Sequence, residues 1–190
     1  MNYQLVSRQH SQRRQVEQFI CERYWSSFQA CLIALPDMLL AVFDDDALIA
    51  ACGLQFAEDR PLFSEYYLDQ ALTDYQVAGQ RLPERNKIAE IGSMAARSAD
   101  DLKPLFAAIV EITTQLNRTL VIFTATGYLQ RTLRRSGVVL SELAPAHETA
   151  LPNELQGIWG DYYRHHPKVL GGWLAQGFGR FIQTTEAIAC

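Results

Sequence analysis

The stretch Lys87-Ile-Ala-Glu-Ile-Gly-Ser-Met-Ala-Ala96 decides the fold. It is apolar on both of its alternating faces, which is typical of a strand in the centre of a sheet that is covered on both sides. An apolar helical stripe follows from Leu102 to Leu116, and Thr119 to Phe123 is a second short apolar run. A buried strand, a helix and another buried strand in this order predict a right-handed crossover between parallel strands.

The sequence on either side extends this unit. We expect a strand at 2–6, a helix around Val16 to Tyr24, and a β-hairpin of 38–43 and 47–56. A second short helix is expected over Phe28 to Ala34, and an irregular excursion over 58–86. Beyond the second buried run, Thr126 is expected to cap a helix that Gly137 ends, and 138–140 is expected to form a final strand.

These elements predict an α/β fold with a mixed central sheet flanked by helices. We assign residues 1–145 to an α/β core and residues 146–190 to a C-terminal extension packed on the same domain. Within this extension, Val169 to Ile182 is interpreted as a partly helical apolar flap, with a membrane-surface segment as the alternative.

The composition indicates a soluble globular protein. Hydrophobic residues make up 48% and charged residues 20% of the 190 positions, and the net charge of −4 argues against a general nucleic-acid binder. No CxxC pair and no apolar signal sequence are found, so we expect reduced thiols and a cytoplasmic location. The run from Phe28 to Phe43 is interrupted by Pro36 and Asp37, so no membrane span is expected. No metal site is predicted either, because adjacent His165 and His166 lack partners at ligand spacing.

Five stretches together carry a resemblance to a known family. They are Val16-Glu-x-Phe-Ile20, Leu62-Phe-Ser-Glu-Tyr-Tyr-Leu-Asp69, Glu90-Ile-Gly-Ser-Met-Ala95, Phe123-Thr-Ala-Thr126, and Trp159-Gly-Asp-Tyr-Tyr163 with Pro167 and Val169. Their order and spacing, over residues 8–172, resemble the thermostable hemolysin family. The order of elements also resembles the GNAT-type N-acyltransferase fold, which acyl-homoserine-lactone synthases share. The chain departs from the family pattern with Ser64 in place of an apolar residue, and with Ser93-Met94 in place of Asn-Leu.

The resemblance implies an acyl donor whose phosphopantetheine thioester lies against the end of the central strand. In such folds a glycine-rich loop at the start of the next helix binds the pyrophosphate of coenzyme A. The matching loop here, Arg97 to Lys103, has no glycine and carries Asp100 and Asp101, which are also ordinary N-cap residues. The expected donor is therefore acyl-coenzyme A or an acyl carrier protein. The carrier protein suits this loop better, because its thioester lacks the nucleotide. The expected acceptor is a small amine.

Glu90 is the candidate general base. In a regular strand its carboxylate shares a face with Gly92 and Met94, where burial would raise its pKa and suit it to accept a proton from an amine. The alternative is a structural ion pair, for instance with Arg97. The other residues expected to contact substrate near this strand end are Gly92, Ser93, Met94, Ala95, Thr124, Thr126 and Trp159.

Two further clusters are candidates for the chemistry. Glu65, Tyr67 and Asp69 would share one face of a strand or converge in a loop, where they would bind a polar acceptor; a solvated edge is the alternative. Tyr162 or Tyr163 would protonate a leaving thiolate, and aromatic packing is the alternative.

Arg131, Arg134 and Arg135 form one basic face of a predicted helix. Such a face would receive an acidic carrier protein or a phosphate, although a merely solvated face has the same pattern.

Three functions are consistent with the sequence. The one that we favour is an acyltransferase that moves an acyl group from a thioester to a small amine. The alternatives are a membrane-active haemolysin, which rests on the family name, and a non-catalytic ligand-binding domain on the same fold. The sequence has no GxSxG, P-loop or HExxH motif that would favour other chemistry.

Overall fold

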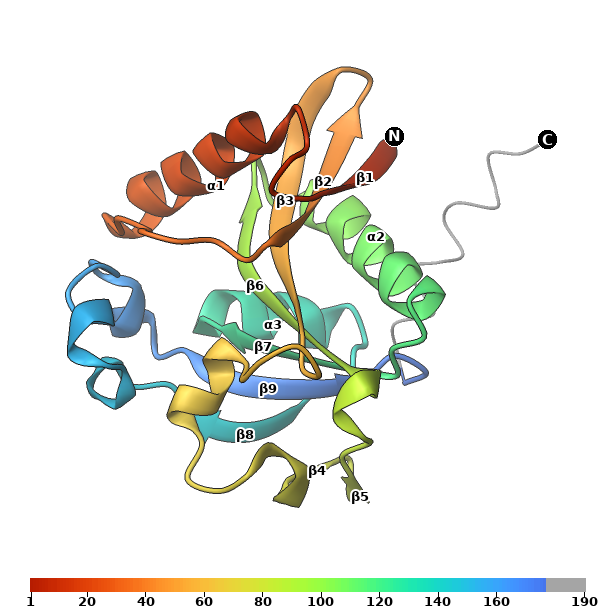
Figure 1. The fold of residues 1–190 in the computed structure, drawn as a ribbon, viewed down its shortest axis with the longest axis vertical. Helices are drawn as coiled ribbons and strands as arrows, with labels where there is room; N and C mark the ends of the chain where they lie inside the picture. The colour runs from red at the N-terminus through yellow and green to blue at the C-terminus, as the bar shows by residue number, and fades with distance from the viewer. Residues whose placement is uncertain (177–190) are drawn as a thin grey trace.

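The computed structural model describes residues 1–176 and places a seven-stranded mixed sheet at their centre, with strand order β1-β2-β3-β6-β7-β9-β8 (Figure 1). The predicted α/β fold with a mixed sheet is confirmed. The elements of this sheet and its helices are β1 (Asn2–Val6), α1 (Arg13–Phe28), β2 (Met38–Asp44), β3 (Ala47–Phe56), β6 (Ile88–Ala96), α2 (Leu102–Gln115), β7 (Leu120–Ala125), α3 (Gly127–Arg135), β8 (Ser141–Pro145) and β9 (Lys168–Trp173).

The excursion at 58–86 is irregular, as predicted. It holds three short 3₁₀ helices, η1 (Phe63–Tyr67), η2 (Leu72–Asp74) and η3 (Arg85–Lys87), and a small separate hairpin of β4 (Gln76–Val77) and β5 (Gln80–Arg81). Three more 3₁₀ helices lie between β8 and β9, namely η4 (Glu148–Ala150), η5 (Asn153–Leu155) and η6 (Tyr162–His165).

Two predicted elements are wrong. No helix forms over Phe28 to Ala34: Gln29 adopts a left-handed conformation with φ 56° and ends α1, and the following segment bonds instead to Ile158 through the Cys31 amide at 2.6 Å. The strand predicted at 138–140 forms instead at Ser141–Pro145 as β8, because Val138 is buried and its amide bonds to Leu133 of α3. Both errors arise from contacts that local periodicity does not encode.

Strand β9 is an element that the sequence did not predict. It lies between β7 and β8 and pairs antiparallel with both of them. The interpretation of Val169 onward as a partly helical flap is therefore wrong up to Trp173, and residues 177–182 of that flap lie outside the described part of the chain. Adjacent Gly171 and Gly172 hid the alternating pattern by which strands are recognised.

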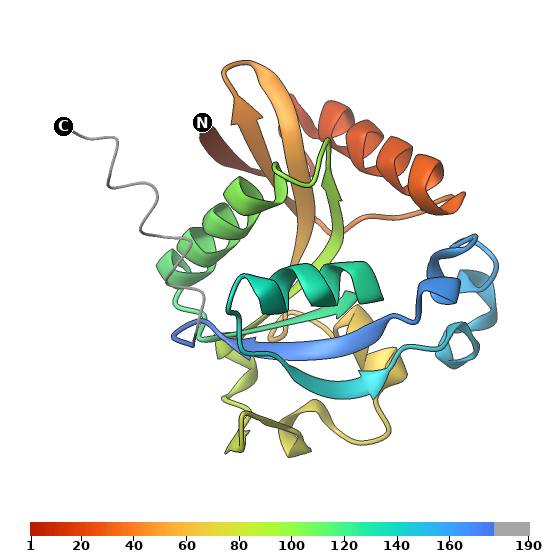
Figure 2. The same cartoon turned by 180° about the vertical axis from the view of Figure 1, so that it is seen from behind.

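Helices cover the two faces of the sheet separately. On one face α2 and α3 pack with side chains such as Val42, Leu54 and Val121 around a large apolar core (Figure 2). On the other face α1 packs on β3 and β6 through side chains such as Val16 and Ile20, and η1 packs near β7 and β9. The sheet is therefore buried on both sides, as its near-continuous apolar strands require.

The central strands β6 and β7 separate along their length. They pair in parallel only from Ile88, opposite Leu120, to Glu90, opposite Ile122. Immediately beyond, β6 carries a bulge: its partners on β3 pass from Gly53–Gly92 to Ala51–Ala95, so β6 has one extra residue, and Ser93 adopts φ 50°. A gap lined by side chains opens between the strands at this point.

The bulge corrects one expectation about side-chain direction. A regular strand would place Met94 on the same face as Glu90. The extra residue reverses the alternation, so that Met94 packs against the core under α2 while Ala95 joins the core under α1.

Candidate functional site

Two cavities meet where β6 and β7 separate. The larger has a volume of about 680 Å³ and lies between η1, the segment after α1 and the loop that carries Trp159. The smaller, about 270 Å³, lies between the end of α1 and the starts of α2 and α3. Their shared wall consists of Tyr24, Ile91, Ser93, Thr124 and Tyr162.

Glu90 lies in the wall of the larger cavity with only 5% of its surface exposed. One carboxylate oxygen, Oε2, accepts the backbone N–H of Phe63 at 2.7 Å. The other, Oε1, accepts the backbone N–H of Ser64 at 2.8 Å and a short hydrogen bond from the Ser64 hydroxyl. The first turn of η1 therefore holds the carboxylate in a fixed orientation.

Burial and hydrogen bonding shift the pKa of Glu90 in opposite directions. Burial raises the pKa of Glu90, whereas the bonds from the Ser64 hydroxyl, the Ser64 amide and the Phe63 amide lower it, and the neighbouring charge of Glu65 raises it. Burial prevails, so the pKa of Glu90 lies above the ordinary glutamate value. A carboxylate of this kind is a stronger base than an ordinary glutamate, which suits it to accept a proton.

The alternative partner of Glu90, Arg97, lies elsewhere. Arg97 forms an ion pair with Asp101 at 3.6 Å, and Asp101 also accepts the Ser98 amide at 2.9 Å and the Ser98 hydroxyl at 2.7 Å. This network closes the loop before α2 upon itself. The carboxylate of Asp101 thus accepts the Ser98 N–H, a backbone donor of the kind that would otherwise bind a phosphate.

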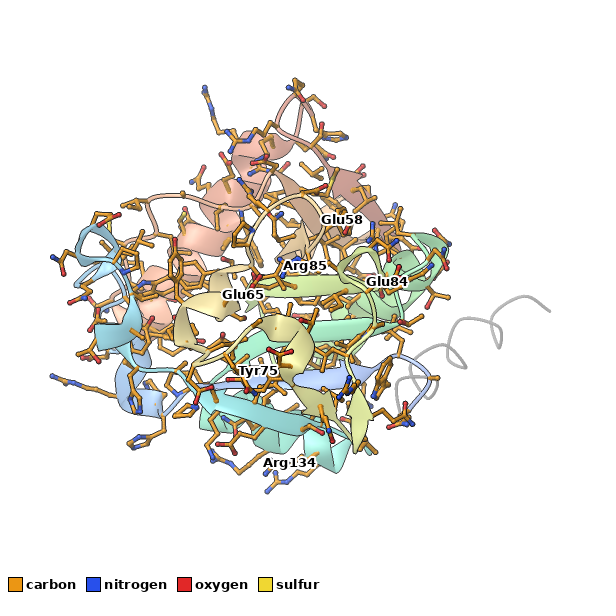
Figure 3. The ribbon with its side chains drawn as sticks, turned by 60° about the horizontal axis from the view of Figure 1, so that its bottom comes forward. Glu58, Glu65, Tyr75, Glu84, Arg85 and Arg134 are labelled. Atoms are coloured by element: carbon orange, nitrogen blue, oxygen red, sulfur yellow. The ribbon has the colours of Figure 1, made fainter. Side chains whose placement is uncertain are left out.

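The predicted cluster of Glu65, Tyr67 and Asp69 is divided. Glu65 and Tyr67 line the larger cavity, whereas exposed Asp69 lines neither cavity and accepts the Tyr75 hydroxyl at 2.5 Å. Glu65 forms an ion pair with Arg85 at 2.7 Å (Figure 3). Burial raises the pKa of Glu65, but the Arg85 hydrogen bond, the Leu62 amide and the Arg85 charge outweigh it and hold the pKa below its ordinary value.

The two adjacent tyrosines have different environments. Tyr162 lines both cavities, its hydroxyl lies 3.3 Å from the carbonyl oxygen of Thr124, and burial raises its pKa well above the ordinary value. Tyr163 lines neither cavity; its hydroxyl bonds to that of Tyr67 at 2.7 Å, and burial raises its pKa to about 12. Of these two tyrosines, only Tyr162 lines the cavities.

Trp159 lines the larger cavity within an aromatic cluster. Its indole N–H is buried and has no hydrogen-bond partner among residues 1–176. The cluster is held by Gly160, whose φ of 52° and missing Cβ let the chain approach α1: a Cβ would lie 2.2 Å from the Phe28 carbonyl oxygen. The Asp161 amide then bonds to that oxygen at 2.7 Å.

The other residues predicted to contact substrate all reach the cavities. Gly92 and Ser93 line the larger one, Ser93, Met94, Ala95 and Thr126 the smaller one, and Thr124 both. The positive φ of Ser93 also gives a physical reason for the asparagine expected in the family, since asparagine tolerates this conformation better than most residues.

The predicted partner surface lies apart from these cavities. Arg131, Arg134 and Arg135 are exposed on α3, and no ion pair holds them within the described residues (Figure 3 labels Arg134). Residues 1–176 contain no cluster of His, Cys, Asp and Glu side chains arranged to hold a metal ion. None of the helices in this range has the length and hydropathy that crossing a bilayer requires.

Several residues of the site were not predicted from sequence. In sequence, Ser64 stands out only as a departure from the family pattern, whereas in the structure its hydroxyl donates to Glu90. The apolar segment from Leu32 to Pro36 lines the larger cavity, as do Arg8 and Arg60. The apolar composition of 32–36 is a signal for this wall, but the sequence pattern predicts a helix up to Ala34 and no cavity lining.

Known proteins resemble this chain in sequence profile and in fold. The sequence profile described as thermostable hemolysin matches residues 6–178. The acyl-homoserine-lactone synthase LasI superposes with a TM-score of 0.63 at 12% identity, covering 96% of this chain and 94% of LasI. FeeM, an N-acyl amino acid synthase from uncultured soil microbes, gives 0.62 at 10% identity, covering 92% and 96%.

BjaI, a CoA-dependent acyl-homoserine lactone synthase solved with SAM and isopentyl-CoA, superposes with a TM-score of 0.63 at 12% identity, covering 98% of this chain and 89% of BjaI. No curated protein sequence matches this chain significantly. At these identities the structural likeness establishes the fold, which is the GNAT-like acyltransferase fold expected from the sequence. By its profile match over nearly its whole length, the chain belongs to the thermostable hemolysin family.

Proposed function

We propose that this chain transfers an acyl group from a phosphopantetheine thioester to a small amine, with Glu90 as the general base. The observation that carries the proposal is the buried carboxylate of Glu90 in the wall of a largely apolar cavity, at the point where β6 and β7 separate. A base of raised pKa beside a space for an acyl chain is what aminolysis of a thioester needs.

The chemistry needs two ligands that meet. The amine nitrogen attacks the carbonyl carbon of the thioester, a C–N bond forms, and the N–H proton passes to the carboxylate of Glu90. The C–S bond then breaks, the thiolate takes a proton from the hydroxyl of Tyr162, and exchange with solvent returns a proton to Tyr162 and removes the one on Glu90. Because both cavities reach Tyr162, a phosphopantetheine arm in the smaller cavity would place its thioester at their shared wall, with the acyl chain and the amine in the larger cavity.

The donor is the acyl-phosphopantetheine of a carrier protein or acyl-coenzyme A. The relative BjaI was solved with isopentyl-CoA and is described as CoA-dependent, so the fold accommodates that donor. In this chain, Asp101 closes the loop before α2 onto Ser98, and the exposed arginines of α3 offer a basic surface for an acidic carrier protein. These two features favour the carrier protein.

The test is acyl transfer by the purified full chain. The protein is incubated with acyl-coenzyme A or acyl-carrier protein and a panel of primary amines, including amino acids. Free thiol release and the mass of the N-acyl product are then measured. Glu90→Gln is expected to lower turnover by about 10²–10⁴-fold. Glu154→Gln is the matched control, because Glu154 is exposed and lines neither cavity.

Two results would contradict the proposal. Equal turnover by wild type and Glu90→Gln would remove Glu90 from the reaction. Binding of thioesters with no transfer to any amine would favour a ligand-binding domain on the same fold.

A further inference from the structure

A continuous chain of side-chain oxygens leads from Glu90 to the cavities. The Ser64 hydroxyl is fully buried and donates to Oε1 of Glu90. On its other side it lies 3.4 Å from the hydroxyl of Thr124. Thr124 is half-buried and lies in the wall that the two cavities share. Thr124, the outer end of this series of oxygens, therefore borders the space where two ligands would meet.

The hydrogen bonds along this series of oxygens all point from Thr124 towards Glu90. A hydroxyl group carries a single proton. The proton of Ser64 is directed to the carboxylate, so in the contact with Thr124 it is the Thr124 hydroxyl that donates. Thr124 Oγ1 then keeps its lone pairs free to accept a hydrogen bond from a ligand N–H.

Direct access of a ligand to Glu90 is more restricted than access to Thr124. Three donors already bond to the carboxylate, two at Oε1 and one at Oε2. Phe63 and Ser64 cover it from η1, and only 5% of the Glu90 surface remains exposed. Thr124 is half-buried and lines both cavities, so it is the more accessible end of the network.

We propose that Ser64 and Thr124 carry the proton of the attacking amine to Glu90, and that Ser64 is the positioning residue that holds the carboxylate for this transfer. This inference rests on the proposed function. The proton leaves the amine nitrogen for Thr124 Oγ1, the proton of Thr124 moves to Ser64 Oγ, and the proton of Ser64 moves to Glu90 Oε1. Each hydroxyl gains one proton and loses one, so only the amine and Glu90 change their charge.

The first experiment tests the relay by turnover. Thr124→Val keeps the shape but removes the hydroxyl, and it is expected to lower kcat by about 10²-fold or more with little change in KM for the thioester. Thr124→Ser restores a hydroxyl and is expected to recover most of the activity. Thr113→Val is the matched control, because its fully buried hydroxyl bonds only to carbonyl groups of α2 and lies outside both cavities.

The second experiment tests the role of Ser64 without any substrate. The carboxyl groups are labelled with ¹³C, and the resonance of Glu90, assigned by its loss in Glu90→Gln, is titrated in wild type and in Ser64→Ala. The Ser64 hydrogen bond lowers the pKa of Glu90, so its removal is expected to move the titration midpoint to higher pH. Glu65 and Tyr67 of η1 also interact with Glu90, and both remain unchanged in this comparison.

The outcomes separate the two proposals. If Glu90→Gln loses turnover while Thr124→Val keeps it, the proton reaches Glu90 directly and the relay is overturned. If the midpoint of Glu90 is the same in Ser64→Ala, Ser64 does not position the carboxylate. If the wild-type chain transfers no acyl group, the proposed function and the relay both fail, while the positioning role of Ser64 is still decided by the titration.

Discussion

The buried carboxyl group of Glu90 should make the stability of this chain depend on pH in a way that Glu90→Gln removes. Burial raises the folded-state pKa of Glu90 above the value of about 4.3 that an unfolded glutamate has. The folded chain therefore keeps this proton to a higher pH than the unfolded chain does. The stabilising contribution is fully present below about pH 4.3 and is lost as the pH rises through the folded-state pKa.

The magnitude follows from one linked proton. Over the window between the two pKa values, the free energy of unfolding of wild type falls relative to the variant by at most about 1.36 kcal/mol per pH unit. Below the window, the hydroxyl oxygen of the protonated acid can still accept a hydrogen bond, whereas the NH2 group of glutamine only donates and leaves the N–H of Phe63 or Ser64 without an acceptor. The two proteins should then differ by a constant offset of about 1–3 kcal/mol in favour of wild type.

The assay is urea denaturation of both proteins at a series of pH values, followed by tryptophan fluorescence. Glu65→Gln serves as a control of opposite sign. The folded-state pKa of Glu65 is lowered, so its contribution is present above the unfolded value and is lost as the pH falls through the folded-state pKa. The stability of wild type relative to Glu65→Gln should therefore rise with pH, while that relative to Glu90→Gln falls.

A constant difference between wild type and Glu90→Gln across the pH range would refute this reasoning, because the carboxyl group would then be unperturbed by burial. A wild type that gains stability with pH, as in the Glu65 comparison, would mean that the hydrogen bonds from Phe63 and Ser64 outweigh burial.

Three further predictions concern the surroundings of the site. Gly160→Ala places a Cβ 2.2 Å from a backbone oxygen at positive φ and should lower the free energy of unfolding by about 2–4 kcal/mol in the same assay; an unchanged value would contradict the close approach. Ser93→Gly should raise that free energy by about 0.5–1 kcal/mol, and a loss would show that the left-handed conformation is not strained. Replacing Arg131, Arg134 and Arg135 by Glu should weaken acyl-carrier-protein binding about tenfold at low salt, with a smaller effect at high salt and none on acyl-coenzyme A; equal binding would exclude this face as the docking surface.

The central part of the fold could be predicted because its signals are local. The apolar run of β6, the broad stripe of α2 and the glycine after α3 each act within a few residues. The segment after α1 could not be predicted in the same way. Its conformation depends on Gln29 at positive φ and on a hydrogen bond from Cys31 to Ile158, which is far away in sequence.

For the site, Glu90 could be predicted from local sequence, whereas its partner Ser64 could not, because that contact joins segments far apart in sequence. A carboxylate in an apolar strand identified Glu90, since the cost of burying it needs an explanation. Its partner could not be deduced, because Arg97 is close in sequence whereas Ser64 reaches it only through the folding of η1 over the sheet. The separation of Asp69 from Glu65 likewise reflects the 3₁₀ turn of η1, in which strand alternation does not apply.

The bulge in β6 connects the fold to the chemistry that we propose. In a regular strand, Met94 would lie on the face of Glu90 and its side chain would occupy the space beyond Gly92. One extra residue turns Met94 into the layer of α2 and leaves the small side chain of Ala95 on the side of α1. Pairing with β7 has already ended, so the space between the strands is bounded by Thr124 and Tyr162. In the function that we propose, two ligands that enter from opposite cavities meet at the wall that contains Thr124 and Tyr162, beside the network that ends at Glu90.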